Sequence, residues 1–177
     1  MACDIALGRL EPCKDSVGGI NAVYFVNYGD IPSSGITYDV TDTDMISVVG
    51  AAVDAYKFEV RGASTYTENI QSSRENGTTA FEQVLELQLK KLTKEDHKTI
   101  KLLSYGRPHI IIEDNNGNFL LAGLEYGMDV TGGTVVTGGA MSDTSGYTLT
   151  FTGMEKIPAN FIEGTLAAAG FTVTEGV

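Results

Sequence analysis

The chain has 177 residues, of which 42% are hydrophobic and 20% charged, a composition typical of a folded globular protein and not of a disordered one. Its length predicts one domain over residues 1–177. Twelve Lys and Arg against 23 Asp and Glu give a net charge of −11. This balance argues against tight nucleic-acid binding, because such binding needs cations that displace counterions from phosphates. No apolar run of about 18 residues is present, so we expect no transmembrane helix and no membrane partner.

The N-terminal residues and the cysteines indicate an intracellular setting. Residues 1–9 contain no basic segment followed by an apolar core, so we expect no secretory signal. Cys3 and Cys13 fit neither a zinc nor a CxxC spacing. We therefore expect two reduced thiols in a cytoplasmic setting, with a bridge closing the N-terminal segment as the alternative.

The first predicted elements are strands. In residues 20–28, bulky apolar groups occupy both alternating sets of positions, which predicts a strand covered on both faces. A turn or loop at residues 30–35 follows. Two short strands are predicted near residues 36–40 and 45–49, separated by Thr41-Asp42-Thr43-Asp44.

The strongest pattern is a long hairpin made of residues 52–74 and 81–90. Asn76-Gly77 favours a type I′ turn, because both central residues of that turn need φ > 0. With the turn there, Tyr66 faces Leu87 and Gln71 faces Glu82, and one face is apolar. The apolar set is Tyr56, Phe58, Val60, Tyr66, Ile70, Phe81, Leu85, Leu87 and Leu89. The hydrophilic set, our candidate functional surface, is Lys57, Glu59, Arg61, Thr65, Thr67, Gln71, Glu82, Glu86, Gln88 and Lys90.

The second half of the chain predicts one clear helix and more strands. Thr93 is a candidate N-cap with Asp96 at the third helical position, and Gly106 followed by Pro108 ends the helix. Ile100 and Leu103 give it a narrow apolar stripe. A hairpin is predicted from residues 109–113 and 119–124 around a turn at 114–118. A loop or broken strand (126–145), a strand (146–152), a short helix (158–169) and a last strand (171–177) follow.

Motifs of enzymes and metal sites are missing. The sequence has no GxSxG, HExxH, GxxxxGK[ST] or GxGxxG pattern. We expect His97 to be solvated and His109 to be structural, since neither has a recognisable catalytic partner. The stretch Asp114-Asn115-Asn116-Gly117-Asn118 places its glycine wrongly for a calcium loop and predicts a turn. We therefore expect no catalytic residue, no metal and no cofactor.

The order of elements resembles that of the major tail tube proteins of long-tailed bacteriophages. The resemblance is carried by the long hairpin and the strand-to-helix passage of residues 85–105. It continues in the hairpin Ile110-Ile111-Ile112-Glu113-Asp114…Gly117…Leu120-Leu121-Ala122-Gly123. It ends with Gly138-Gly139-Ala140…Asp143…Gly146-Tyr147-Thr148-Leu149-Thr150-Phe151. It covers residues 18–155 as a pattern of elements, without an invariant signature.

The resemblance implies a mainly β (α+β) subunit: an antiparallel β-sandwich or barrel with a long hairpin and one outer helix. Six copies would form a ring, and stacked rings would conduct duplex DNA within a virion tail, assembled in the host cytoplasm beside other tail proteins. The hydrophilic set would line the bore, which we expect to be mixed in charge because Lys57, Arg61 and Lys90 lie beside Glu59, Glu82 and Glu86. The alternative is a capsid-decoration or host-surface, carbohydrate-binding β-sandwich module of a virion. A small hydrolase is the third reading, disfavoured because the chain has only two histidines.

Overall fold

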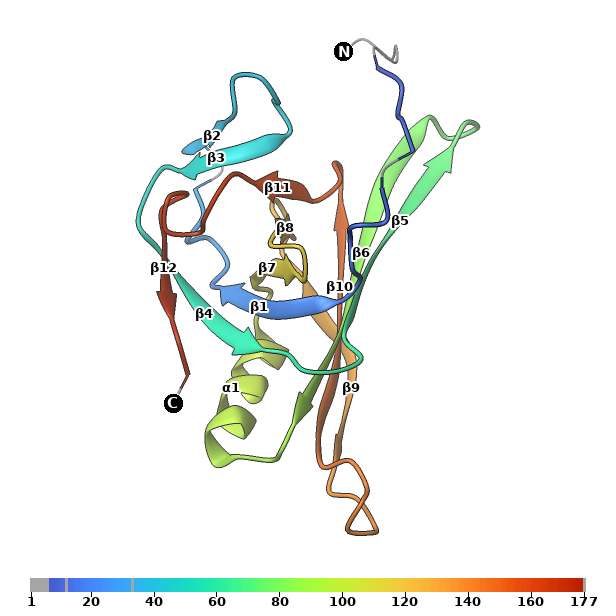
Figure 1. Cartoon of the computed structure of the whole chain (residues 1–177), viewed down its shortest axis with the longest axis vertical. Helices are drawn as coiled ribbons and strands as arrows, with labels where there is room; N and C mark the ends of the chain where they lie inside the picture. The colour runs from blue at the N-terminus through green and yellow to red at the C-terminus, as the bar shows by residue number, and fades with distance from the viewer. Residues whose placement is uncertain (1–6, 12, 33, 177) are drawn as a thin grey trace.

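A computed structural model describes residues 7–11, 13–32 and 34–176 and shows a mainly β protein with two sheets and one helix (Figure 1). The predicted fold class, a β-sandwich or barrel, is confirmed. In the described part of the chain, no helix is both long and apolar enough to cross a membrane.

The larger sheet has eight strands in the order β12-β4-β1-β7-β8-β11-β3-β2. Most neighbours are antiparallel, whereas β12 with β4 and β11 with β3 are parallel. Its strands are β1 (Ile20–Val26), β2 (Ile36–Tyr38), β3 (Met45–Val49), β4 (Val53–Glu59), β7 (His109–Asp114), β8 (Phe119–Ala122), β11 (Asn160–Ile162) and β12 (Phe171–Thr174).

This sheet curls because β3, near one edge, continues directly into β4, near the other. The amide of Val49 donates to the carbonyl of Ala169 at 2.9 Å, and the amide of Val53 donates to Gly170 at 3.1 Å, so the C-terminal turn joins the two ends. The concave side holds one buried core: Ala22, Tyr24, Val26, Ile31, Ile46, Val49, Val53, Ala55, Ile111, Leu121, Ile162, Leu166, Ala169 and Phe171.

The smaller sheet has four strands in the order β5-β6-β10-β9 and packs on the convex side of the larger one. Its strands are β5 (Thr65–Ser73), β6 (Thr78–Lys90), β9 (Asp129–Val136) and β10 (Gly146–Glu155), all antiparallel. Between the sheets lies a second core: Val23, Phe25, Val60, Leu85, Leu87, Ile100, Ile110, Ile112, Ala122, Met128, Tyr147, Leu149 and Phe151. Residues of β1 and β7 enter both cores, which confirms that β1 is covered on both faces.

The predicted helix is present as α1 (Lys94–Tyr105). The Thr93 side chain accepts a hydrogen bond from the amide of Asp96 at 3.0 Å, and Gly106 ends the helix, as expected. Ile100 enters the second core and Leu103 packs against it. The main cover of the small sheet's apolar face is nonetheless the large sheet, with α1 at one end.

The predicted strand of residues 52–74 is wrong: it is two strands in two sheets. The chain turns at residues 61–63, where Gly62 has φ 139°, a conformation that side chains disfavour. β4 pairs with β1 in the large sheet, whereas β5 pairs with β6 in the small sheet. Val60 before the turn and Tyr66 after it fall on the same parity, so the apolar pattern of the sequence does not reveal the change of sheet.

The predicted hairpin register is wrong by two residues. Ser73 pairs with Thr78, so the tip is the four-residue loop 74–77 and not a two-residue turn, although Gly77 has φ 63°. Tyr66 therefore pairs with Leu85 and not with Leu87. A shift of two keeps every side chain on its predicted face, because strand side chains alternate with period two.

The helix expected at residues 158–169 is absent. The segment instead forms β11 and a turn, in which the amide of Ala169 donates to Thr165 at 3.1 Å. β11 is held by pairing with β3 and β8, and by Asn160, whose side-chain amide donates to the carbonyl of Asp44 at 2.7 Å. These long-range partners hold residues 160–162 extended, and so override a local helical preference.

The remaining predicted elements are present with shifted ends. The region 126–145 contains β9 followed by an exposed loop, and the turn 114–118 closes β7 and β8. The Asp114 carboxylate accepts from the amides of Asn116 and Asn118, at 2.9 and 2.8 Å, which stabilises this turn. Cys13 is exposed and free, whereas Cys3 lies outside the described residues, so the redox expectation stays a prediction.

Candidate assembly and conduit surface

The outer face of the small sheet is a continuous hydrophilic surface built from all four strands, and we call it the polar face. Strand pairing places Thr65, Glu86, Thr150 and Gly132 in one row across the sheet. The next rows repeat the pattern; for example, Gln88 pairs with Thr148, which pairs with Thr134. Three apolar residues interrupt the pattern: Val84, Val136 and Met154. On the two central strands, β6 and β10, the alternate residues are apolar and are buried in the second core, whereas on the edge strands only Tyr66 and Val130 pack against it.

Seven of the ten candidate residues lie on this face: Thr65, Thr67, Gln71, Glu82, Glu86, Gln88 and Lys90. Glu82 is held there by its neighbours, since its carboxylate accepts from the side-chain amide of Gln71 at 3.2 Å. Asn69 donates to the same oxygen at 3.5 Å. These contacts orient the carboxylate along the sheet surface and leave the face rich in hydrogen-bonding groups.

Lys57, Glu59 and Arg61 do not lie on the polar face, which corrects the sequence-based prediction. Lys57 and Glu59 belong to β4 in the large sheet, and Arg61 lies in the turn that follows. The ammonium of Lys57 lies 3.2 Å from Glu175 and 3.7 Å from Glu59. These ion pairs raise the pKa of Lys57, chiefly through the hydrogen bond to Glu175.

Sequence reasoning did not assign the contribution of β9 and β10 to this surface. Thr148, Thr150 and Thr152 alternate with buried residues, and the hydroxyls of Thr131 and Thr152 lie 3.0 Å apart. The alternation in β10 was visible in the sequence. Its pairing with β6, which places these threonines beside the glutamates, spans more than 50 residues of chain and carries no local signal.

The charge of the polar face is more acidic than the sequence predicted. With Lys57 and Arg61 on other elements, its strands present the carboxylates of Glu82, Glu86 and Asp129 and the ammonium of Lys90. Side chains that carry negative charge on one surface repel phosphate groups that approach it.

The small sheet has two free edges within the described chain. β5 is hydrogen-bonded only to β6, and β9 only to β10. β5 has nine residues and β9 has eight, so both edges are long. Long unpaired edges attract other strands, and proteins usually shorten, cover or pair them.

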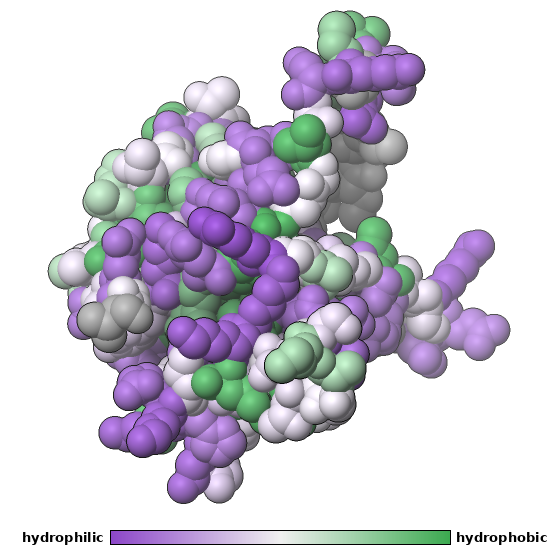
Figure 2. Space-filling view, turned by 60° about the horizontal axis from the view of Figure 1, so that its bottom comes forward, coloured by the Kyte–Doolittle hydropathy of each residue, from purple (hydrophilic) through white to green (hydrophobic). Residues whose placement is uncertain are grey.

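Both hairpins extend beyond the body of the molecule, in opposite directions (Figure 1). The β5–β6 tip reaches past one end, where Ile70 is 70% exposed, and the β9–β10 loop with the fully exposed Met141 reaches past the other. Viewed from the end that carries this loop and α1, the surface is mostly hydrophilic with small hydrophobic groups between (Figure 2).

A buried polar network ties the inner side of the small sheet to the segment between β8 and β9. Gln83 accepts from the amide of Gly123 at 2.8 Å and donates to Glu68 at 3.0 Å. Glu68 in turn accepts from the amide of Ala159 at 2.8 Å. Because these groups are largely enclosed, the network fixes how the two sheets sit on each other.

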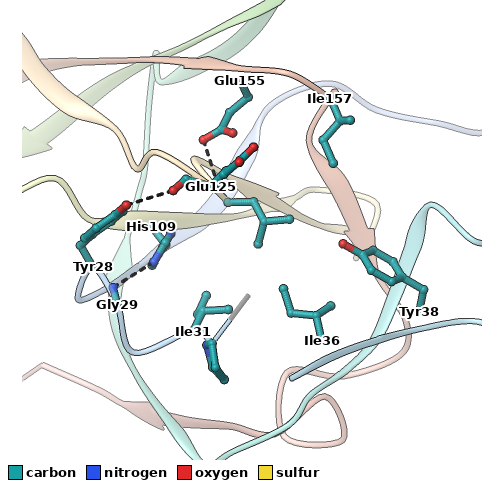
Figure 3. A pocket seen from close by; sticks show the side chains of 11 residues that line it. Tyr28, Gly29, Ile31, Ile36, Tyr38, His109, Glu125, Glu155 and Ile157 are labelled. Atoms are coloured by element: carbon teal, nitrogen blue, oxygen red, sulfur yellow. Dashed lines mark hydrogen bonds between the residues drawn. The ribbon is translucent and has the colours of Figure 1, made fainter. Parts of the chain in front are cut away.

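Both histidines lie where the sequence predicted. His97 is exposed on α1, and His109 is 2% exposed at the start of β7. His109 Nδ1 lies 2.6 Å from the carbonyl of Gly123, and Nε2 accepts from the amide of Gly29 (Figure 3). Burial lowers its pKa. In the described residues, no group of three or more His, Cys, Asp or Glu side chains is arranged to hold a metal ion.

Comparisons with known proteins give no family to which the chain can be assigned. No family model, no curated protein and no solved structure matches it.

Proposed function

We propose that the chain is a structural subunit of a bacteriophage tail tube, in which six copies form a ring and stacked rings make a conduit for duplex DNA. The observation that carries the proposal is the small sheet: its outer face is hydrophilic and both of its edge strands are free. Pairing β5 of one copy with β9 of the next would satisfy both edges in every copy. Closure of a sheet into a barrel is the arrangement that removes edges altogether.

Barrel geometry favours six copies over three. Six four-stranded sheets give a barrel of about 24 strands. With strands about 4.8 Å apart and tilted by about 40°, its backbone diameter is roughly 48 Å. A trimer of the kind expected for a decoration module would have half that diameter, and its side chains would fill most of the interior. Six copies leave a bore wide enough for duplex DNA.

The position of the other elements agrees with this arrangement. The large sheet and α1 both lie on the side of the small sheet away from the polar face (Figure 1). In a ring they would therefore form the outer wall. The projecting β5–β6 and β9–β10 hairpins would point along the tube axis toward neighbouring rings.

The proposal is tested by the mass of the assembly and by its images. We expect light scattering to show hexamers or larger species, chemical cross-linking to give a ladder ending at six, and negative-stain images to show rings or tubes. A protein that stays monomeric or trimeric at high concentration, with no ring in any image, would refute the tube and favour the decoration or host-surface module.

A second test addresses the bore. Assembled wild-type tubes should not retard duplex DNA at physiological salt, because carboxylates outnumber ammonium groups on the wall. The double variant Glu82→Lys, Glu86→Lys should retard DNA in a salt-sensitive way. The control Asp54→Lys, Glu95→Lys carries the same net charge on exposed sites outside the polar face and should not. Equal retardation by both variants would mean that the polar face is not the surface that meets DNA.

A further inference from the structure

The sequence contains two Asn-Gly pairs, and each lies at the tip of a hairpin. Asn76-Gly77 belongs to the loop 74–77 between β5 and β6, and Asn116-Gly117 belongs to the turn 114–118 between β7 and β8. Asparagine is among the chemically labile residues of proteins. It is most reactive before glycine, because glycine has no side chain to screen its backbone nitrogen from the Asn carboxamide. Both pairs are exposed, so their contacts are what distinguishes them.

The side chain of Asn116 is held at both of its polar atoms. Its Oδ1 atom accepts from the amide of Val17 at 2.9 Å. Its Nδ2 atom donates to the carbonyl of Val17 at 2.8 Å and to the Asp114 carboxylate at 3.2 Å. The backbone amide of Gly117 donates to the carbonyl of Asp114, also at 3.2 Å. Attack of the Gly117 nitrogen on the Asn116 carboxamide would have to break several of these hydrogen bonds, which is unfavourable.

The side chain of Asn76 has no such restraint. Its backbone amide donates to the Ser73 hydroxyl at 3.3 Å, but its carboxamide makes no hydrogen bond to the residues that the structure describes, and neither does the amide of Gly77. A carbon added to Gly77 would meet nothing within 4 Å. The tip also stands clear of the body of the molecule (Figure 1). The two groups that react in deamidation are therefore neighbours in the chain and are not held apart by the fold.

We propose that Asn76 is a site of spontaneous deamidation, whereas the fold protects Asn116. The Gly77 nitrogen attacks the side-chain carbonyl carbon of Asn76, and the new C–N bond closes a cyclic imide. The bond from that carbon to Nδ2 breaks, and ammonia leaves with the proton that the Gly77 amide has lost. Water then adds to either carbonyl of the imide and opens it, which gives aspartate or isoaspartate.

The reaction changes the hairpin tip in charge and in length. Each product replaces a neutral carboxamide by a carboxylate and so adds one negative charge, beside Glu75, to a chain whose net charge is −11. In isoaspartate the backbone runs through the side chain, so an extra methylene group enters the loop 74–77. This loop closes the pairing of Ser73 with Thr78, so we expect the end of the hairpin to loosen while the buried cores stay unchanged. The inference concerns a single copy and does not rest on the proposed function.

Peptide mass spectrometry of the aged protein tests this assignment. The full-length protein is diluted until light scattering shows single copies, kept in mildly alkaline buffer, and digested at acidic pH at intervals. Asn76 should convert at least about tenfold faster than Asn116, because restraining the reacting groups away from each other slows an intramolecular attack by such factors. Aspartate and isoaspartate should both appear in place of Asn76, and in heavy-oxygen water each should carry a heavy oxygen atom.

Unfolding provides the matched control, because both pairs keep their Asn-Gly sequence and lose their folded contacts. In concentrated urea the two conversion rates should become similar. Asp114→Ala removes an acceptor of Asn116 Nδ2 and should speed conversion at Asn116 without changing the rate at Asn76. Gly77→Ala, checked for folding by circular dichroism, should slow conversion at Asn76, because its methyl group screens the backbone nitrogen.

The folded protein and the urea control each provide a result that would overturn the inference. In the folded protein these results are conversion of Asn116 as fast as that of Asn76, or aspartate without isoaspartate in place of Asn76. In urea, a difference between the two sites as large as in the folded protein would show that the neighbouring sequence, and not the fold, sets the rates.

Discussion

Replacing Leu87 by Ala tests which face of the small sheet is buried. Leu87 is fully buried in the second core and pairs with Leu149 across β6 and β10. The change removes three carbon groups, worth about 0.8 kcal/mol each in transfer free energy. A residual cavity of about 60 Å³ adds roughly 1.4 kcal/mol. We therefore expect the free energy of unfolding to fall by about 4 kcal/mol, a large part of the 5–15 kcal/mol of an ordinary domain.

Urea denaturation followed by circular dichroism measures this loss. With a slope of about 2 kcal/mol/M, the midpoint should fall by about 2 M at unchanged slope. Glu86→Ala, one position earlier and on the polar face, is the matched control and should stay within about 0.5 kcal/mol of the wild type. Leu87→Asp should prevent folding, because it buries an unpaired charge. A loss below about 1 kcal/mol for Leu87→Ala, or a larger loss for Glu86→Ala, would refute the assigned faces.

Three further predictions concern buried groups, each measured as a free energy of unfolding in urea. Tyr66→Phe should raise the free energy of unfolding by about 1 kcal/mol, because the buried Tyr66 hydroxyl has no partner among the described residues. Tyr147→Phe should lower it by about 1 kcal/mol, because the Tyr147 hydroxyl donates to the carbonyl of Thr93. Equal losses for the two variants would contradict this prediction. Gly127→Ala should lower the free energy of unfolding more than Gly77→Ala does. Both glycines have positive φ, but only at Gly127 would the added carbon meet the backbone of Arg107. Equal losses would mean that this contact relaxes. His109 has a lowered pKa in the fold, so its contribution is present above the unfolded pKa of about 6.5 and is lost as pH falls below it. The wild type should therefore lose more stability between pH 7 and pH 5 than His109→Gln, and parallel profiles would show that His109 is not the cause.

The sequence predicted the buried and hydrophilic faces of β5 and β6 and that these two strands pair, but not their register or the pairing of β6 with β10 and of β10 with β9. Leu85 and Leu87 alternate with Glu86 and Gln88, and this period of two assigns each side chain to the core or to water whatever strand lies beside it. The register was wrong by two residues because Asn76-Gly77 indicated a turn of minimal length, while the four-residue loop 74–77 satisfies the same alternation. The face on which a side chain lies follows from the local alternation of residues, whereas the partner of a strand depends on residues far away in the chain.

Local chemistry likewise determined the helix and its ends. Thr93, Asp96 and Gly106 act on backbone groups within one turn of themselves, so their effect does not depend on the rest of the fold. At residues 158–169 the local preference failed, because Asn160 and its neighbours gain more from pairing with β3 and β8 than from a helical turn.

The sequence by itself therefore determined the β-rich class, the capped helix and the hydrophilic face that contains Glu82 and Glu86. Only the tertiary structure decided that Lys57, Glu59 and Arg61 leave this face, that the threonines of β10 join it, and that Val17 holds the Asn116 side chain. The physical reason is that these outcomes depend on contacts between residues far apart in the chain, and that the apolar residues keep the same parity before and after the change of sheet at Gly62.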